Sequence, residues 1–335
     1  MIQLTSRSAV LSPIGRRTEF SGQLVHRSDA EDIFPTGWTR QTDTRFSVSA
    51  RWPRTHRFFA PVSGRYQDPL LIAETMRQTT MLLSHAEFDV PVGDQFVMWE
   101  LRYVSAPDRL VLGAARDGSR EPGEGAEVPS GAWDITVDVS CSRIRRRGSG
   151  LGSMQLELLL HRSGRRIAAG GGRISCTSAR VYERLRGDRR SVIGAPLPLL
   201  PSVAPHEAGR TSERDVVLSP TPRRNVWKLR LDTGHPTLFA RPNDHVPGIL
   251  LLEAARQAAN VLDVRHAFLP TAMDNAFLRY VELDRPCLIE ARTVPSGDRS
   301  TTRVQVRATQ DGEPVFTSTL DSPAAGGGYQ RTGRA

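Results

Sequence analysis

The chain contains two closely similar segments, and this internal repeat restricts the folds that it can adopt. Residues 70–79 read LLIAETMRQT and residues 249–258 read ILLLEAARQA, so both place Glu-x-x-Arg-Gln inside an apolar run. A histidine, His56 in the first copy and His235 in the second, lies 18 residues before each glutamate. A self-match of this kind indicates one structural unit used twice. We therefore expect two halves with the same architecture.

Each repeated segment is predicted to lie in a buried helix. Asp68-Pro69 supplies an N-cap residue followed by proline at the first helical position, and residues 70–87 contain no helix breaker. In the second half, Pro247-Gly248 opens a helix over residues 249–266. Both segments are apolar around most of their circumference, which is typical of helices enclosed by other elements.

Runs typical of β-strands surround both helices. One run precedes each helix and four follow it, separated by short turns rich in glycine and serine. The expected strands are 44–52, 96–103, 133–144, 153–161 and 166–176 in the first half, and 225–232, 276–283, 287–294, 302–309 and 314–320 in the second. This order predicts an α+β fold, a tandem (double) hot-dog, in which each half is an antiparallel sheet wrapped around a central helix.

Proline and glycine mark the expected domain boundaries. Residues 187–213 are rich in proline and are predicted to be the linker between the halves. The linker separates a first domain, residues 24–186, from a second domain, residues 214–322. The terminal segments 1–23 and 323–335 are expected to be mobile.

Composition argues against several classes of protein. The net charge of +9 comes almost entirely from arginine, because Lys228 is the only lysine, and no nucleic-acid-binding motif accompanies it. The basic run 143–147 is interpreted as a solvated turn, with a dock for an acidic carrier protein or a phosphate, and DNA binding, as alternatives. No apolar run has the length of a membrane span or the form of a secretory signal. Cys141, Cys176 and Cys287 are expected in the core, without metal or cofactor, in a cytoplasmic protein.

Each predicted helix carries a narrow polar stripe. Residues three, four, seven and eleven positions apart share one helical face. These positions are Glu74, Arg77, Gln78, Met81 and His85 in the first helix, and Glu253, Arg256, Gln257, Asn260 and Val264 in the second. One interpretation is an ion pair that only orients the helix, but two matching copies in apolar helices favour a functional role.

The segment before the second helix differs from that before the first. Here the chain reads Asp-His-Val-Pro-Gly, with His245 eight residues before Glu253. The free amides of the first helical turn, beginning at Gly248, could stabilise an oxyanion, and His245 is a candidate catalyst beside them. Residues 245–257 are therefore the preferred site.

Several ordered blocks of the sequence resemble the A-factor biosynthesis (AfsA) family of double hot-dog proteins. These blocks are residues 52–56, 68–78, 90–98, 146–148, 181–187 and 244–257, and together the match covers about residues 24–320. The resemblance implies synthesis of γ-butyrolactone signalling molecules without a cofactor, by two halves packed as an internal pseudo-dimer. It implies transfer of a β-ketoacyl group from an acyl-carrier-protein or coenzyme A thioester to a hydroxyl of dihydroxyacetone phosphate. The family's usual Asp-His pair after a phenylalanine is replaced here, since Ala240-Arg241 follows Phe239, which bears on activity or substrate choice.

Residue types suggest roles in this chemistry. Burial in an apolar helix is expected to raise the pKa of Glu253, which would then accept the proton of the attacking hydroxyl. The guanidinium of Arg256 would hold the substrate phosphate. Glu74 and Arg77 would form a second site or complete a shared one. The other candidate binding residues are Gln78, Gln257, Gly248, His56 and His235.

Two alternatives from other classes remain. A hot-dog thioesterase or dehydratase would use the same glutamate with water or on a 3-hydroxyacyl thioester, and a thioesterase would release free acid without dihydroxyacetone phosphate. A non-catalytic regulator that binds a lactone or DNA would retain its signalling function after replacement of both Glu74 and Glu253.

Overall fold

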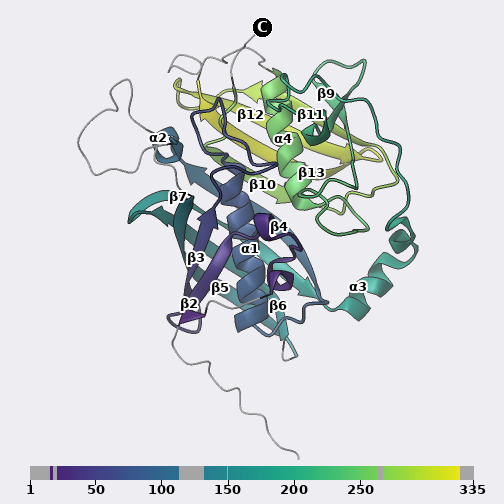
Figure 1. The fold of residues 1–335 in the computed structure, drawn as a ribbon. Coiled ribbons are helices and arrows are strands. Elements are labelled where there is room, and N and C mark those ends of the chain that lie inside the picture. Colours follow the sequence, from purple (N-terminus) through teal and green to yellow (C-terminus); the bar gives the residue numbers. More distant parts are fainter. Residues whose placement is uncertain (1–15, 18–20, 113–131, 149, 263–266, 325–335) are drawn as a thin grey trace, which may run out of the picture.

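Both halves of the chain contribute to one continuous antiparallel sheet (Figure 1). The computed structural model describes residues 16–17, 21–112, 132–148, 150–262 and 267–324. Within these residues the sheet has 13 strands in the order β1-β2-β3-β5-β6-β7-β4-β10-β13-β12-β11-β9-β8. The first half contributes the strands up to β4, and the second half contributes those from β10 onward. The chain is thus a double hot-dog, as the sequence predicts.

The strands of the first half follow their predicted positions closely. They are β1 (Arg16–Arg17), β2 (Pro35–Arg40), β3 (Arg45–Trp52), β4 (Gln95–Ser105), β5 (Trp133–Arg147), β6 (Gly150–Arg162) and β7 (Arg165–Thr177). Alternate residues of β3 and β5 are buried, as expected for strands with one face toward a core. The strand β2, which lies between β1 and β3, was not predicted, because a proline and a glycine interrupt its short sequence.

The second half repeats this pattern with shorter strands. They are β8 (Leu218–Pro220), β9 (Val226–Leu229), β10 (Ala272–Phe277), β11 (Cys287–Val294), β12 (Thr301–Gln310) and β13 (Glu313–Pro323). The predicted strand 276–283 is wrong over most of its length, since β10 ends at Phe277. Residues 278–282 instead run along a cavity, where the amide of Val246 donates to the carbonyl of Val281.

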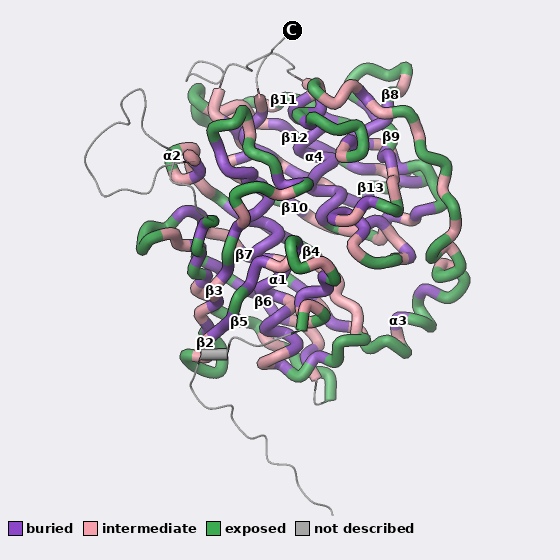
Figure 2. Tube along the Cα trace, viewed as in Figure 1, coloured by how far each residue is buried: buried purple, intermediate pink, exposed green. Residues whose placement is uncertain are grey.

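One central helix covers each half of the sheet, and Figure 1 shows both on the same side. Helix α1 (Leu70–Glu87) has the predicted bounds. Helix α4 (Gly248–Leu262) begins one residue before its predicted start, and predicted residues 263–266 lie outside the described part. Both helices are buried along most of their length (Figure 2). The halves meet where β4 pairs with β10, from Glu100 opposite Ala276 to Val104 opposite Ala272.

Two shorter helices lie outside the sheet. Helix α2 (Pro107–Leu110) follows β4, and α3 (Ala179–Arg186) follows β7. Helix α3 opens the connection to the second half, which Figure 1 shows passing along the outside of the molecule. It was not predicted, and it forms the end of the predicted first domain, directly before the linker expected from residue 187. Most of the terminal segments 1–23 and 323–335 lies outside the described residues.

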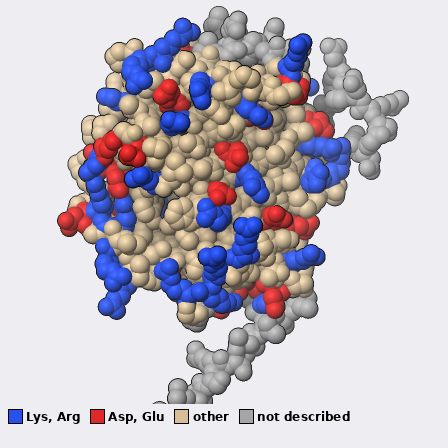
Figure 3. All heavy atoms as spheres, turned by 180° about the vertical axis from the view of Figure 1, so that it is seen from behind, with Lys and Arg blue, Asp and Glu red and all other residues tan. Residues whose placement is uncertain are grey.

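The outer face of the sheet is polar and of mixed charge. Figure 3 shows acidic and basic side chains interspersed on the face opposite that of Figure 1. Cross-strand ion pairs contribute to this pattern, among them Arg51 with Asp134 and Arg173 with Glu100. Cys141, Cys176 and Cys287 lie in strands and are buried, as predicted. In the described part of the chain, no helix combines the length and the apolar character needed to cross a membrane.

Candidate active site

The glutamate of each central helix is fully buried and lies in a hydrogen-bond network, and the two networks have the same arrangement. The carboxylate of Glu74 accepts hydrogen bonds from Arg27, Arg77 and Gln78 at 2.7–3.0 Å. The carboxylate of Glu253 accepts the equivalent bonds from Arg210, Arg256 and Gln257 at 2.5–2.9 Å. The sequence repeat therefore encodes the same arrangement of a glutamate, two arginines and a glutamine in each half.

These networks correct the prediction that the pKa of Glu253 is raised. Burial does raise the pKa of this carboxyl, but the charges of Arg210 and Arg256 outweigh burial and lower it to about 2. For Glu74, the charges of Arg27 and Arg77 outweigh burial in the same way, and its pKa is also about 2. Carboxylates stabilised to this degree are weak proton acceptors at neutral pH.

The repeated histidines fix the loops that lead to the helices. Nδ1 of His56 accepts hydrogen bonds from two backbone amides, so Nε2 carries the proton and donates to Asp32 at 3.0 Å. His235 makes the same contacts, with Asp215 as the acceptor at 3.0 Å. Both imidazoles are buried and lie outside the main cavity.

The glutamines of the repeat also bind the backbone. Oε1 of Gln78 accepts from the amide of Phe34, and Oε1 of Gln257 accepts from the amide of Val217. Each side-chain amide thereby ties its helix to the residue directly before a strand of its half, β2 in the first half and β8 in the second. Neither glutamine lines the cavity.

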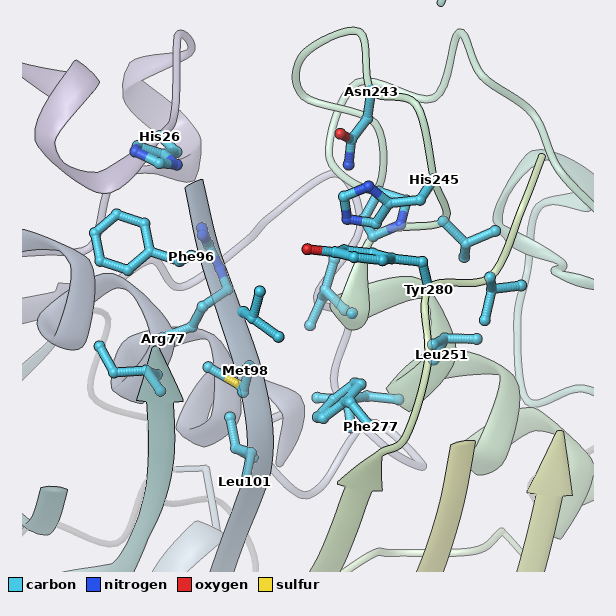
Figure 4. Close-up of a pocket in the computed structure, with 18 of the residues that line it drawn as sticks. His26, Arg77, Phe96, Met98, Leu101, Asn243, His245, Leu251, Phe277 and Tyr280 are labelled. Atoms are coloured by element: carbon cyan, nitrogen blue, oxygen red, sulfur yellow. The ribbon is translucent and has the colours of Figure 1, made fainter. Parts of the chain in front are cut away.

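A cavity of about 620 Å³ lies between the two halves (Figure 4). Its floor is apolar, with Met98 and Leu101 from β4 on one side and Leu251 and Phe277 from the second half on the other. Of the predicted site residues, the cavity brings together Glu74, Arg77, His245 and Gly248. It does not include Glu253, Arg256, Gln78, Gln257, His56 or His235. Among the described residues, no group of three or more His, Cys, Asp or Glu side chains is placed to hold a metal ion.

His245 is held in a defined orientation at this cavity. Its Nδ1 lies 2.6 Å from Oδ1 of Asp244, and a carboxylate can only accept, so Nδ1 carries a proton; in the neutral imidazole the lone pair is then on Nε2. Tyr182 donates to the same carboxylate oxygen at 2.6 Å, and Arg186 binds the other oxygen at 2.9 Å. The ring of Tyr280 packs against the imidazole with centroids 4.7 Å apart (Figure 4). This is the arrangement of a histidine oriented as a general base.

The electrostatics of this group keep Asp244 ionised. Burial raises the pKa of its carboxyl, but hydrogen bonds from His245, Tyr182 and Arg186 lower it well below its usual range. The pKa of Tyr182 is raised far above its ordinary value by burial and by the bond to Asp244. Tyr182 therefore stays a donor, and Asp244 stays an acceptor over the physiological pH range.

The two helix N-termini differ in a way that bears on catalysis. At α1, Oδ1 of Asp68 accepts from the amide of Leu70 at 2.9 Å, and Asp68 is fully buried. At α4, Pro247 and Gly248 line the cavity, and the amides of Gly248 and Ile249 have no backbone acceptor within the described residues. Only the second helix thus presents free first-turn amides to the cavity.

Further cationic and basic groups surround the mouth of the cavity. Arg241 is exposed to solvent and lines the cavity together with Arg77 and Arg27. Nδ1 of His85 donates to the carbonyl of Val90 at 2.6 Å, so its Nε2 accepts from Nε2 of His26 at 3.0 Å. Nδ1 of His26 is then an unprotonated acceptor with no partner in the described structure.

Comparison with known proteins identifies the family. A family model described as the A-factor biosynthesis hotdog domain, AfsA, matches residues 13–178 and 195–324. The chain belongs to the AfsA family. A relative from Streptomyces virginiae is 46% identical over 90% of this chain and 97% of its own, and one from Streptomyces coelicolor is 44% identical over 91% of each. Both are named 2-oxo-3-(phosphooxy)propyl 3-oxoalkanoate synthase.

A solved structure has a more distant similarity to this AfsA-family chain. The 12:0-ACP thioesterase from Umbellularia californica is 8% identical, with a TM-score of 0.46 over 83% of this chain and 94% of its own.

The sequence alone did not identify several residues that line the cavity or hydrogen-bond to residues that line it. Arg27 and His26 lie in a segment without a recognisable motif, and only the structure places them beside α1. Tyr182 and Arg186 fall in one of the blocks on which the family resemblance rests, so a signal existed there without an assigned role. Arg241 was noted only as a departure from the family pattern.

Proposed function

We propose that this protein is a 2-oxo-3-(phosphooxy)propyl 3-oxoalkanoate synthase. It transfers a 3-oxoacyl group from a thioester of acyl carrier protein or coenzyme A to the free hydroxyl of dihydroxyacetone phosphate. The products are the phosphorylated ester and a free thiol. The names and high identity of the AfsA-family relatives support this assignment.

The observation that carries the proposal is the position of the His245–Asp244 pair. The pair lies between an apolar floor, which suits an acyl chain, and a mouth rich in arginine, which suits a phosphorylated acceptor. A base, an apolar pocket and cationic groups are the three elements that transfer from an acyl thioester to a phosphorylated alcohol requires.

His245 starts the reaction as general base. Its Nε2 accepts the proton of the acceptor hydroxyl as the hydroxyl oxygen attacks the thioester carbonyl. Asp244 stabilises the imidazolium that forms, because it holds the Nδ1 proton at 2.6 Å. This role replaces the one that the sequence suggested for Glu253, which lies outside the cavity.

The open N-terminus of α4 stabilises the tetrahedral intermediate. The free amides of Gly248 and Ile249 donate to the oxyanion that develops from the thioester carbonyl. When the intermediate collapses, the C–S bond breaks, and the imidazolium returns its proton to the departing thiolate. The buried carboxylate of Glu74 holds Arg77 at the cavity and takes no proton itself.

The test is an assay of ester formation. Purified protein is mixed with a 3-oxoacyl thioester and dihydroxyacetone phosphate, and the phosphorylated ester is detected by mass. Wild type is expected to form it, and His245→Asn is expected to form far less. No ester above background with wild type and His245→Asn alike would sink the assignment, and free acid released without dihydroxyacetone phosphate would point to a thioesterase.

A further inference from the structure

We infer that Arg77 and Arg241 form a subsite for the phosphate of a phosphomonoester, in the place that the Asp68 carboxylate occupies in the other half of the molecule. The inference rests on the proposed function for its choice of ligand. Arg77 and Arg241 take the phosphate-binding role that the sequence suggested for Arg256. The protein itself provides the pattern from which the subsite is derived.

That pattern is the contact between Asp68 and Arg256. Oδ2 of Asp68, at the N-terminus of α1, lies 3.4 Å from Nη1 of Arg256 on α4. Oδ1 of the same carboxylate accepts from the amide of Leu70 at 2.9 Å. An anion therefore bridges the arginine of one helix and the first turn of the other. With this partner and Glu253, Arg256 is buried and is not available to a ligand.

The mirrored position in the second half lacks this carboxylate. The repeat aligns Arg77 with Arg256 and Pro247 with Asp68. The backbone supports this equivalence, because Leu71 donates to the carbonyl of Asp68 at 3.1 Å and Leu250 donates to that of Pro247 at 3.0 Å. Pro247 and Arg77 both line the cavity. Where one half holds an internal carboxylate, the other half offers open space to a ligand.

A count of charges shows what the open copy requires. In the closed copy, the network around Glu253, the carboxylates of Glu253 and Asp68 balance Arg210 and Arg256. In the open copy, the network around Glu74, one carboxylate faces Arg27 and Arg77, which leaves one positive charge without an internal partner. Uncompensated charge at a partly enclosed site favours binding of an anion.

Arg241 lines the same cavity as Arg77 and adds a second positive charge to it. Within the described part of the chain it has no ion pair or hydrogen bond, and the charges of Arg77 and Arg27 act on it. A phosphomonoester carries about 1.5 to 2 negative charges at neutral pH, which matches two unbalanced guanidinium groups. A carboxylate or a phosphodiester would balance only one of them.

The first test measures binding of inorganic phosphate by calorimetry and thermal shift, without turnover. Pro247→Asp places a carboxylate at the mirrored position, and Pro247→Asn is its uncharged control. We expect phosphate to bind and stabilise wild type and Pro247→Asn, and to bind Pro247→Asp at least ten-fold more weakly. Equal phosphate affinity in the two variants would overturn the subsite.

A second variant keeps the test decisive if substitution of Pro247 disturbs folding. Arg241→Gln changes a side chain at the cavity mouth and is expected to weaken phosphate binding about ten-fold or more. Arg279→Gln is the matched control, because Arg279 also lines the cavity but pairs with Glu313 at 3.2 Å. Unchanged binding in Arg241→Gln, or an equal loss in Arg279→Gln, would contradict the assignment.

Kinetics then distinguish the acceptor's phosphate from that of a carrier. With an N-acetylcysteamine thioester as donor, which has no phosphate, Arg241→Gln should raise KM for dihydroxyacetone phosphate about ten-fold while kcat changes little. An effect confined to donors that carry phosphopantetheine would overturn the proposal.

The outcomes separate the subsite from the proposed reaction. If wild type forms no ester but phosphate binding responds as expected, the subsite stands and the proposed reaction fails. If ester forms with the same KM in every variant, the reaction stands and the subsite fails.

Discussion

Oδ1 of Asp244 and Nδ1 of His245 are 2.6 Å apart, so two consecutive residues form the proposed acid–base pair of the cavity. The contact places a proton on Nδ1, so in the neutral imidazole Nε2 is the proton acceptor. The orientation of the pair depends on Tyr182 and Arg186, which hold the carboxylate from α3.

The first prediction concerns this pair. His245→Asn should lower kcat/KM for ester formation by about 10²–10⁴-fold, the range for loss of a general base. Asp244→Asn should lower it by about 10²-fold or more, because an amide can also donate to Nδ1 and thereby favour the wrong tautomer. Asp284→Asn is the control, since this exposed carboxylate pairs with Arg189 away from the cavity. Steady-state kinetics with a fixed thioester measures all three, and wild-type rates in His245→Asn would exclude the mechanism.

The second prediction separates stability from catalysis at Glu253. Glu253→Gln leaves the buried charges of Arg210 and Arg256 undercompensated, so the free energy of unfolding should fall by about 3–5 kcal/mol. Urea titration measures this change. The rate per folded molecule should fall much less than in His245→Asn. A large loss of rate without a loss of stability would restore the direct role that the sequence suggested.

The sequence predicts the fold well because the fold depends on local patterns. Asp68-Pro69 and the unbroken apolar run define α1, and alternation defines strands such as β5. The prediction failed at residues 278–283, because β10 ends at Phe277 and residues 278–282 line the cavity instead. A short run of mixed apolar and polar residues does not by itself distinguish a strand from a loop.

The ionisation of the two buried glutamates depends on contacts with residues distant in sequence. The pKa of Glu253 follows from Arg210, 43 residues earlier, and that of Glu74 follows from Arg27, 47 residues earlier. Burial alone would raise both pKa values, and the prediction of a raised pKa for Glu253 considered burial only. The preference for the segment that begins at His245 rested on its difference from the first copy, and the structure places that segment at the cavity while Glu253 lies outside it.

The third prediction concerns acyl chain length. Leu101 forms part of the cavity floor, so Leu101→Phe should leave less room for the end of the chain. Each methylene of the acyl chain that is no longer buried loses about 0.8 kcal/mol of binding free energy. Exclusion of two methylenes should therefore lower kcat/KM for long chains about ten-fold relative to short ones. Leu159→Phe on the outer face of the sheet is the matched control. Competition between a long and a short thioester measures the ratio, and an unchanged ratio in Leu101→Phe would show that the chain lies elsewhere.

The fourth prediction is a loss of stability in mild acid that depends on His26. Burial and nearby arginines lower the pKa of His26 from 6.5 to about 2, so below pH 6.5 the unfolded chain binds a proton that the folded protein does not. The free energy of unfolding should therefore decrease as pH falls below 6.5, by up to about 1.4 kcal/mol per pH unit for this residue. The pKa of His85 is also lowered, and its contribution has the same sign.

Glutamates act in a lower pH range. Glu74 and Glu253 have a pKa of about 2 in the folded protein against 4.5 ordinarily, so their contribution to the free energy of unfolding is present above pH 4.5 and is lost as pH falls toward 2.

Urea unfolding of wild type and His26→Gln between pH 7.5 and 5 isolates the contribution of the histidine. The variant should lose less stability than wild type over this interval, and the difference should grow as pH falls below 6.5. Equal slopes between pH 6.5 and 5 would mean that His26 takes up a proton in the folded protein, and that the chain of hydrogen bonds from His85 does not hold it neutral.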